Sequence, residues 1–282
     1  MCSGAILEAF EPTTRDTDVF CATAAKCGQT WLLTLMHHLR TRGLDPDLGG
    51  KNLLEVTPWL ELPVNLGADG APAYDVEQRI DELERLGDPR VFKMHVVFDE
   101  IPRARGSEAR VVTITRDPRE LPYSMFKHME GLSEGVRGPF SDDFDTYFEK
   151  WMEFGFFFKH VASFWPHRDD PDVLWLRYED LQRDLAGGAR RLGEFLSWDV
   201  GPTDIDRVLP LVGFDHMRAT ERSVLMRGAE MHVWREEARF FREGGVGKNR
   251  ARLSSEQEAR IVERAREVFD PACFELVMSL DH

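Results

Sequence analysis

The sequence has little cysteine, and its cysteines are not arranged to bind a metal. Four occur among 282 residues, none in a CxxC pair: Cys2, Cys21, Cys27 and Cys273. This spacing argues against a zinc site and against a disulfide framework. We therefore expect free thiols, no metal centre and a reducing compartment such as the cytoplasm.

Basic charge and long apolar runs are also scarce. The chain carries 36 lysines and arginines against 50 acidic residues, a formal net charge of −14. We expect no nucleic-acid partner, because no broad basic field gathers phosphates. No run approaches the roughly eighteen apolar residues of a membrane helix, so we expect no membrane span. Residues 1–19 lack the basic start and apolar stretch of a signal peptide.

What remains is the composition of a globular protein, with 42% hydrophobic residues. Short β-branched runs alternate with helical patterns, which predicts an α/β fold: a central, mostly parallel sheet flanked by helices. The expected strands are 17–23, 90–98, 109–116 and the start of 172–181. The expected helices are 29–40, 117–129, 144–165 with a break near Gly155, the end of 172–181, 189–198 and 254–269. We assign one domain to residues 17–270 and an N-terminal extension to 1–16.

Three positively charged or titratable side chains fall near the ends of expected strands. Lys26 follows the first strand, His95 lies in the second and Arg116 ends the third. Ligands of open parallel sheets bind at the carboxyl ends of strands, so these residues mark the candidate site. The segments 43–75 and 230–253 lack periodic apolar positions and are expected to be long lid loops.

The turn TAAKCGQTW, residues 23–31, joins an expected strand to an expected helix. A helix N-terminus offers unpaired backbone N–H groups to an anion. Gly28 allows close approach, while Lys26 adds a charge and Thr30 a hydroxyl. The Walker A pattern is absent, because the lysine precedes the glycine. An ordinary strand–helix connection with a solvated lysine explains the same residues.

Two residue pairs extend this candidate site. Lys93 and His95 are two apart on an expected strand and share a face; the histidine suits a general base and the lysine a stabiliser of developing charge. Arg116 ends a strand and Ser124 follows in the next helix, a combination that suits a phosphate. Taken alone, each pair also fits a structural role, as a hydrogen-bonded core histidine or an ion-paired arginine.

Two further segments leave alternatives open. The strand before Asp117 is compatible with a Walker B strand, whose carboxylate holds Mg²⁺ in a kinase. Residues 239–255 place Arg242, Lys248 and Arg250 among glycines. This segment either closes over an anion as a lid or is a solvated loop.

Taken in order, these pieces resemble the cytosolic-type sulfotransferases, which use 3′-phosphoadenosine 5′-phosphosulfate (PAPS) and have a P-loop-like nucleotide-binding fold. The resemblance runs from about residue 17 to about 270. It is carried by Lys26-Cys27-Gly28-Gln29-Thr30-Trp31 for the family's Lys-Ser-Gly-Thr-Thr-Trp, Lys93-Met94-His95 for Lys-Thr-His, Arg116-Asp117-Pro118 with Ser124, Gly155 to Val161 for Gly-x-x-Phe-x-His-Val, Tyr178-Glu179-Asp180, Gly213-Phe214-Asp215-His216-Met217 for Ser-Phe-Glu-x-Met, and Phe240-Phe241-Arg242-Glu243-Gly244 for Phe-x-Arg-Lys-Gly.

The resemblance implies a role for each matching residue. His95 would take the proton from an acceptor hydroxyl, and Lys26 and Lys93 would stabilise the transferring group. The turn from Lys26 to Trp31, including Cys27, Gly28, Gln29 and Thr30, would hold the 5′-phosphosulfate. Trp31, Tyr178 and Phe214 would pack around the adenine. The 3′-phosphate would be bound by Arg116, Ser124 and Arg242, with help from the Gly244 amide. Phe241 is a further expected cofactor-binding residue. The product would be adenosine 3′,5′-bisphosphate (PAP), and no metal is implied.

Four of the departures from the family pattern concern groups that could hold the donor. Cys27 and Gln29 replace hydroxyl residues in the turn, Gly213 replaces a serine, and Glu243 replaces a lysine. Each change removes a group that could hold the donor. The family's C-terminal dimer motif is not recognisable, which leaves a homodimer open.

The leading hypothesis is sulfuryl transfer from PAPS to a hydroxyl of a small, largely apolar acceptor such as a phenol, sterol, alcohol or glycolipid. The candidate pocket residues are Trp59, Phe98, Phe126 and Phe154. A catalytically silent protein that binds PAP as a sensor or scaffold is the alternative, and a P-loop-type kinase is a third. The sequence does not name the acceptor.

Overall fold

Four short parallel strands form the centre of the computed structural model, which describes residues 2–61, 75–137, 142–225, 233–242 and 244–278. The strands are β1 (Val19–Ala22), β2 (Val91–Met94), β3 (Arg110–Thr115) and β4 (Val173–Arg177). Their order in the sheet is β2-β1-β3-β4, and every neighbouring pair is parallel. Because β1 is flanked by β2 and β3, the carboxyl ends of these three strands lie at one edge of the sheet.

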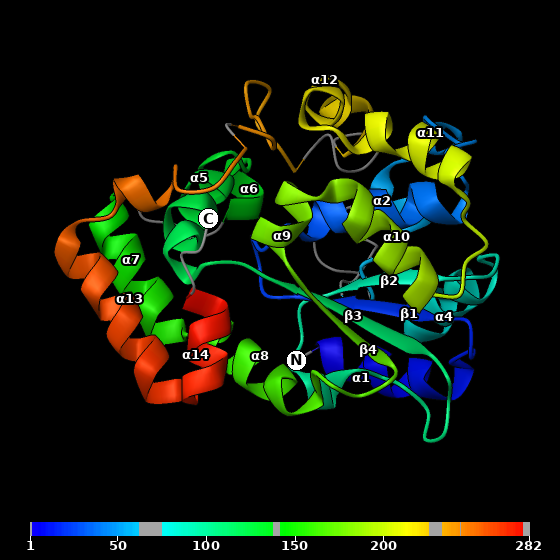
Figure 1. Ribbon diagram of the computed structural model, residues 1–282, viewed down its shortest axis with the longest axis horizontal. Helices are drawn as coiled ribbons and strands as arrows, with labels where there is room; N and C mark the ends of the chain where they lie inside the picture. Colours follow the sequence, from blue (N-terminus) through cyan, green and yellow to red (C-terminus); the bar gives the residue numbers. More distant parts are fainter. Residues whose placement is uncertain (1, 62–74, 138–141, 226–232, 243, 279–282) are drawn as a thin grey trace.

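Helices cover both faces of this sheet (Figure 1). They are α1 (Cys2–Phe10), α2 (Gln29–Arg40), α3 (Leu53–Val56), α4 (Val76–Glu84), α5 (Leu121–Glu130), α6 (Glu134–Arg137), α7 (Phe144–Phe154), α8 (Phe156–Phe164), α9 (Tyr178–Arg183), α10 (Leu185–Phe195), α11 (Pro202–Val212), α12 (Phe214–Val224), α13 (Ser255–Val268) and α14 (Pro271–Met278). The predicted α/β architecture, a parallel sheet flanked by helices, is confirmed.

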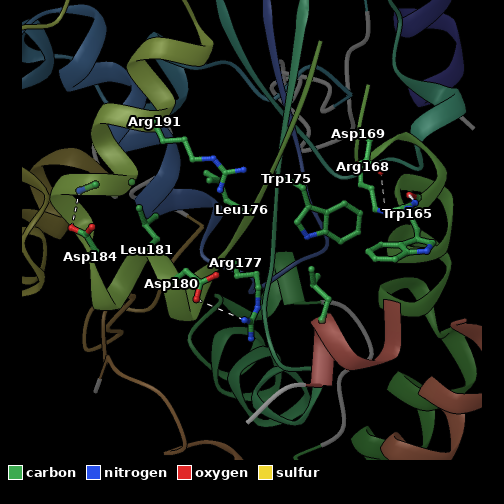
Figure 2. A pocket seen from close by; sticks show the side chains of 13 residues that line it. Trp165, Arg168, Asp169, Trp175, Leu176, Arg177, Asp180, Leu181, Asp184 and Arg191 are labelled. Atoms are coloured by element: carbon green, nitrogen blue, oxygen red, sulfur yellow. Dashed lines mark hydrogen bonds and ion pairs between the residues drawn. The ribbon is translucent and has the colours of Figure 1, made fainter. Parts of the chain in front are cut away.

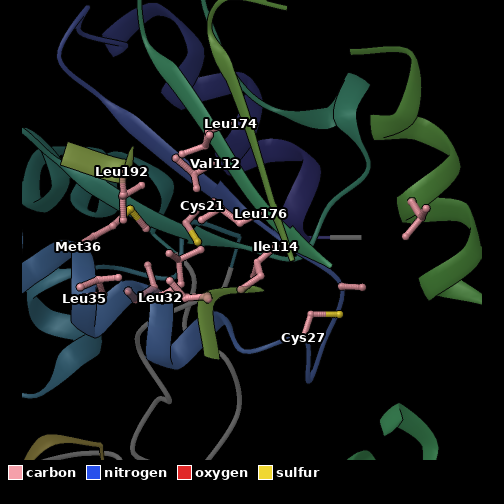
Figure 3. Packing of buried hydrophobic residues seen from close by; sticks show 14 of the residues in the cluster. Cys21, Cys27, Leu32, Leu35, Met36, Val112, Ile114, Leu174, Leu176 and Leu192 are labelled. Atoms are coloured by element: carbon pink, nitrogen blue, oxygen red, sulfur yellow. The ribbon is translucent and has the colours of Figure 1, made fainter. Parts of the chain in front are cut away.

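Each strand alternates its side chains between two buried cores. Cys21, Val112 and Leu174 belong to the larger core, which α2 and α10 complete with Leu32, Met36 and Leu192 (Figure 3). The alternate strand residues Phe20, Phe92 and Val111 belong to the smaller core on the other face. A strand buried on both faces reads as a continuous apolar run, which explains why these strands were recognisable in the sequence.

Residues 2–16 complete the smaller core. Ile6 and Phe10 are fully buried, and the Phe10 ring meets Phe20 and Phe92 edge-on, at 6.1 and 4.9 Å between centroids. The segment that the sequence suggested as an extension therefore packs against the sheet as helix α1, and α1 also contacts α4.

The expected boundaries differ from the observed ones mainly after β2. The prediction of a strand over 90–98 is wrong beyond Met94, because the main chain leaves the sheet there: the His95 N–H bonds to the Glu61 carboxylate, and residues 98–100 form a 3-10 turn. The break expected near Gly155 is confirmed, with φ of 58° between α7 and α8. Helix α13 starts with a capping box formed by Ser254 and Gln257.

The two predicted lid loops are described only in part. Residues 62–74 of the first and 230–232 and 243 of the second, which include the Glu243 substitution, lie outside the described residues. Within the part of the chain that is described, no helix combines the length and apolar character needed to cross a bilayer.

Candidate active site

The turn between β1 and α2 has an unusual backbone. Lys26 and Gly28 both have positive φ, 68° and 100°, a conformation that costs a residue with a side chain free energy. Gly28 also lies against Tyr178: a Cβ at this position would come within 2.7 Å of the Tyr178 ring. Gly28 caps α2 without a side-chain hydrogen bond, so the first N–H groups of the helix are available to an anion.

Gln29 and Cys27 direct their side chains into the protein. The Gln29 amide donates to the carbonyl oxygens of Cys21 and Met94, each at 2.8 Å, and thereby joins the carboxyl ends of β1 and β2. The Cys27 side chain is fully buried in the larger core, and burial raises the pKa of its thiol to about 12. At these two positions the backbone N–H groups of the turn are available to bind an anion, and the side chains are not.

His95 lies directly after β2, beside this turn. Its Nδ1 is 2.7 Å from the carbonyl oxygen of Thr23. A carbonyl only accepts, so Nδ1 carries the proton and, in the neutral ring, Nε2 is a proton acceptor. Burial, with the nearby charge of Lys93, lowers the pKa of His95 to about 3. The imidazole is therefore neutral at physiological pH.

Lys26 points toward a group of residues from α5 and the second lid segment. Its Nζ is 3.3 Å from Nδ1 of His128 and 4.7 Å from the centre of the Phe240 ring. Burial, together with the charges of Arg242, Lys93 and Arg116, lowers the pKa of Lys26 to about 7. A cluster of cations that depress one another's protonation is a site prepared for an anion.

Lys93 completes the catalytic set predicted from the sequence. Its Nζ lies 3.8 Å from the centre of the Trp59 ring, and this ring meets His95 edge-on at 5.2 Å. Its backbone N–H donates to the Pro58 carbonyl at 2.8 Å. Lys26, Lys93 and His95, which are up to 69 positions apart in the sequence, therefore share one electrostatic environment.

Arg116 follows β3 and lies on the adjoining side of the turn. Its Nη2 donates to Glu120 at 2.8 Å and to the Gly245 carbonyl at 3.0 Å, and its guanidinium lies 4.3 Å from the centre of the Tyr178 ring. Its buried Nε has no hydrogen-bond partner among the described residues. An unpaired buried donor is costly, which a bound anion would relieve.

The other predicted donor residues come from α2, α5, the start of α12 and the second lid loop. Trp31 meets Tyr178 edge-on at 5.5 Å, and Ser124 is buried in α5. Phe214, at the start of α12, lies under Gly244: a Cβ there would come within 2.7 Å of its ring. Phe241 packs against the larger core, and Arg242 acts electrostatically on Lys26.

Of the four predicted acceptor-pocket residues, Trp59 alone is placed beside His95 and Lys93 by a described contact. Phe98 stacks on His167 at 3.6 Å, and Phe126 packs against Phe144 and Tyr147 between α5 and α7. Phe154 is 67% exposed and stacks on Phe156.

Two residues of the site, His128 and Trp234, were not predicted from the sequence, and Phe240 was predicted only as part of a motif, without a role. Their rings meet edge-on, at 4.9 Å between His128 and Trp234 and 5.6 Å between His128 and Phe240. Residues 233–235 reach this position by backbone hydrogen bonds to 131–133, after α5. No local motif marks such a contact, although His128 follows Ser124 by one helical turn.

A cavity of about 460 Å³ lies elsewhere, along β4 and between α10 and α14 (Figure 2). It is lined by Trp175, Arg177 and Asp180 among others, and by none of the predicted site residues. Its arginines and aspartates balance one another, and Arg177 pairs with Asp180 at 3.7 Å. The predicted catalytic and donor-binding residues therefore lie at the turn and not in this cavity.

Replacing Gly28 by alanine tests the turn. We expect Gly28→Ala to lower the melting temperature and to abolish nucleotide binding, since the left-handed backbone costs about 1–2 kcal/mol and the new methyl group strikes Tyr178. The matched control is Gly106→Ala, because Gly106 has a φ of 84° but nothing within 4 Å of its Cβ position. Equal losses in both variants would show that the Tyr178 contact is unimportant.

Comparison with known proteins identifies the family. The family model described as "Sulfotransferase domain" matches residues 16–271. Human sulfotransferase 4A1 is 31% identical over 198 residues, 69% of this chain and 65% of that protein. Luciferin sulfotransferase of Photinus pyralis is 25% identical over 249 residues, 83% and 66% of the two chains. The chain thus spans just under two thirds of the length of these relatives.

A solved structure supports the fold. Mouse sulfotransferase SULT7A1, crystallised with PAP, superposes with a TM-score of 0.73 at 18% identity, covering 98% of this chain and 93% of that one. Since the family model covers most of the sequence, this chain belongs to the sulfotransferase family.

Proposed function

We propose that this protein transfers a sulfuryl group from PAPS to a hydroxyl of a small, largely apolar acceptor. The observation that carries the proposal is the state of His95. Its Nδ1–H is held by the Thr23 carbonyl at 2.7 Å, and its neutral Nε2 remains to accept a proton. Family membership supports the type of reaction.

In this mechanism His95 removes the proton of the acceptor hydroxyl as the oxygen attacks sulfur. The sulfuryl group passes to the acceptor, and the bond from sulfur to the bridging oxygen of PAPS breaks. The protein mainly positions the groups and stabilises charge. Lys26 and the N–H groups at the start of α2 neutralise the leaving phosphate, while Lys93, oriented by Trp59, stabilises the transferring group.

Arg116 is the proposed anchor of the 3′-phosphate. Its Nε, which has no hydrogen-bond partner among the residues that the structure describes, and the adjoining segment of Gly244 and Gly245 support this assignment, with Ser124 and Arg242 as further contacts. Trp31, Tyr178 and Phe214 offer aromatic surface for the adenine. In the donor turn, Cys27 and Gln29 contribute backbone N–H groups, as does Thr30 in addition to its hydroxyl.

The acceptor class is proposed from the surroundings of His95. Trp59 flanks the imidazole on one side, and His128, Trp234 and Phe240 gather around Lys26. Aromatic side chains beside a neutral imidazole and two lysines favour a flat apolar body that carries a hydroxyl.

The direct test is transfer of radiolabelled sulfate from PAPS to a panel of phenols, sterols, alcohols and glycolipids. We expect turnover without added Mg²⁺. Strict dependence on ATP would overturn the proposal in favour of a kinase. Tight binding of PAP without turnover on any acceptor would favour a sensor or scaffold.

A further inference from the structure

Glu221 is a buried carboxylate to which no sequence motif points. It lies in α12 and is 1% exposed. Its Oε2 accepts the backbone N–H groups of Phe240 at 3.0 Å and Phe241 at 2.9 Å, and its Oε1 accepts Nη1 of Arg239 at 2.9 Å. Three donors from three consecutive residues therefore satisfy one buried charge, which is what allows a carboxylate to remain inside the protein.

The residues that Glu221 holds belong to the second lid loop. We call residues 239–242 the lid segment. Phe240 places its ring 4.7 Å from Lys26 Nζ, and Arg242 acts on the pKa of Lys26. The segment thus lies beside Lys26 of the donor turn.

Helix α12 contacts this part of the chain at two places. Its first residue, Phe214, lies under Gly244, and Glu221 holds the lid segment two turns further along. A rigid helix that is fixed to a loop at two points sets the position of the residues between them. Here one such residue is Arg242.

We propose that Glu221 is a positioning residue for recognition of the donor's 3′-phosphate. It holds the backbone of Phe240 and Phe241 so that Arg242 and the Gly244 N–H face the phosphate that Arg116 binds. This inference rests on the proposed use of PAPS and PAP. Glu221 does not touch the nucleotide itself.

Removing the carboxylate leaves two backbone donors without a partner and releases Arg239, which is 55% exposed at its side chain and free to turn to solvent. In Glu221→Ala we expect the dissociation constant of PAP, measured by calorimetry, to rise about tenfold, the size of one charged hydrogen-bond network. The affinity for adenosine 5′-phosphate, which lacks the 3′-phosphate, is expected to change less than twofold. For Glu221→Gln, which keeps one acceptor oxygen, we expect a dissociation constant of PAP between those of the wild type and Glu221→Ala.

Two controls separate positioning from general stability. Asp18→Asn removes another fully buried carboxylate, paired with Arg90 at 2.7 Å on the other side of the sheet, and should lower the melting temperature without altering the ratio of PAP to adenosine 5′-phosphate affinity. In a double-mutant cycle, Glu221→Ala should have little further effect on PAP affinity once Arg242→Ala is present.

Two results would overturn the inference. One is a ratio of PAP to adenosine 5′-phosphate affinity that is unchanged in Glu221→Ala. The other is additive losses of PAP binding free energy in Glu221→Ala and Arg242→Ala. Failure of the proposed function looks different, because the wild-type protein itself would then not prefer PAP over adenosine 5′-phosphate. Should Glu221→Ala not fold, Glu221→Gln carries the same test.

Discussion

His95→Ala is expected to reduce the turnover number on the order of 100-fold or more, the range over which a general base contributes. PAP affinity should stay within a few-fold of wild type, because the described hydrogen bonds of His95 go to the Thr23 carbonyl and to Glu61, outside the Lys26–Trp31 part of the turn that is proposed to hold the donor. Steady-state kinetics with PAPS and a phenol, together with calorimetry of PAP, measure the two quantities.

His95→Asn is the matched variant. Its side-chain amide can replace the Nδ1–H bond to Thr23 but cannot accept a proton as a base. We expect it to be as inactive as His95→Ala while melting closer to wild type. His38→Gln, which alters another buried histidine in α2, controls for loss of a buried imidazole. A normal rate in His95→Asn would remove His95 from the role of base.

Lys26→Met is expected to lower the turnover number on the order of 100-fold, the cost of removing one group that stabilises transition-state charge.

Lys26→Met should also remove a pH dependence of PAP binding. Burial and the neighbouring cations lower the pKa of Lys26 to about 7 in the free protein, whereas a bound anion raises it again. Below pH 7 the Lys26 side chain is already charged in the free protein. Above pH 7 it is mostly neutral there, so the protein must take up a proton when PAP binds. PAP affinity should therefore fall as pH rises above 7.

Calorimetry between about pH 7.5 and 9.5, where phosphate groups with a pKa of about 6 are already ionised, tests this sign. Titrations in two buffers of different ionisation enthalpy should report proton uptake by the wild-type protein and none by Lys26→Met. Lys26→Arg keeps the charge at all pH values and should flatten the profile while retaining affinity. Proton release on binding, or a slope that persists in Lys26→Met, would contradict the role given to Lys26.

The fold was largely predictable because its signals are local. β3 is a nearly continuous run of apolar and β-branched residues since both its faces are buried, and α2 carries its buried leucines at helical spacing. The end of β2 was not predictable, because the bond from the His95 N–H to Glu61 connects residues 34 positions apart. Helices α1 and α12 were also missed, as their faces are defined by what they pack against.

The candidate site divides in the same way. The sequence by itself determined the reactive types and their order: Lys26 and Gly28 in a strand–helix turn, Lys93 and His95 near a second strand, and Arg116 after a third. Side-chain chemistry and strand ends are local properties, and the parallel order of strands brings those ends together.

The state of these groups and their surroundings depends on tertiary contacts, which the sequence does not reveal. The tautomer of His95, the lowered pKa of Lys26 and the inward turn of Gln29 depend on burial and on partners distant in sequence. The same holds for the positions of His128 beside Lys26 and of Glu221 beside the lid segment. A hydrogen bond between segments that are distant in the sequence produces no recognisable residue pattern in either segment.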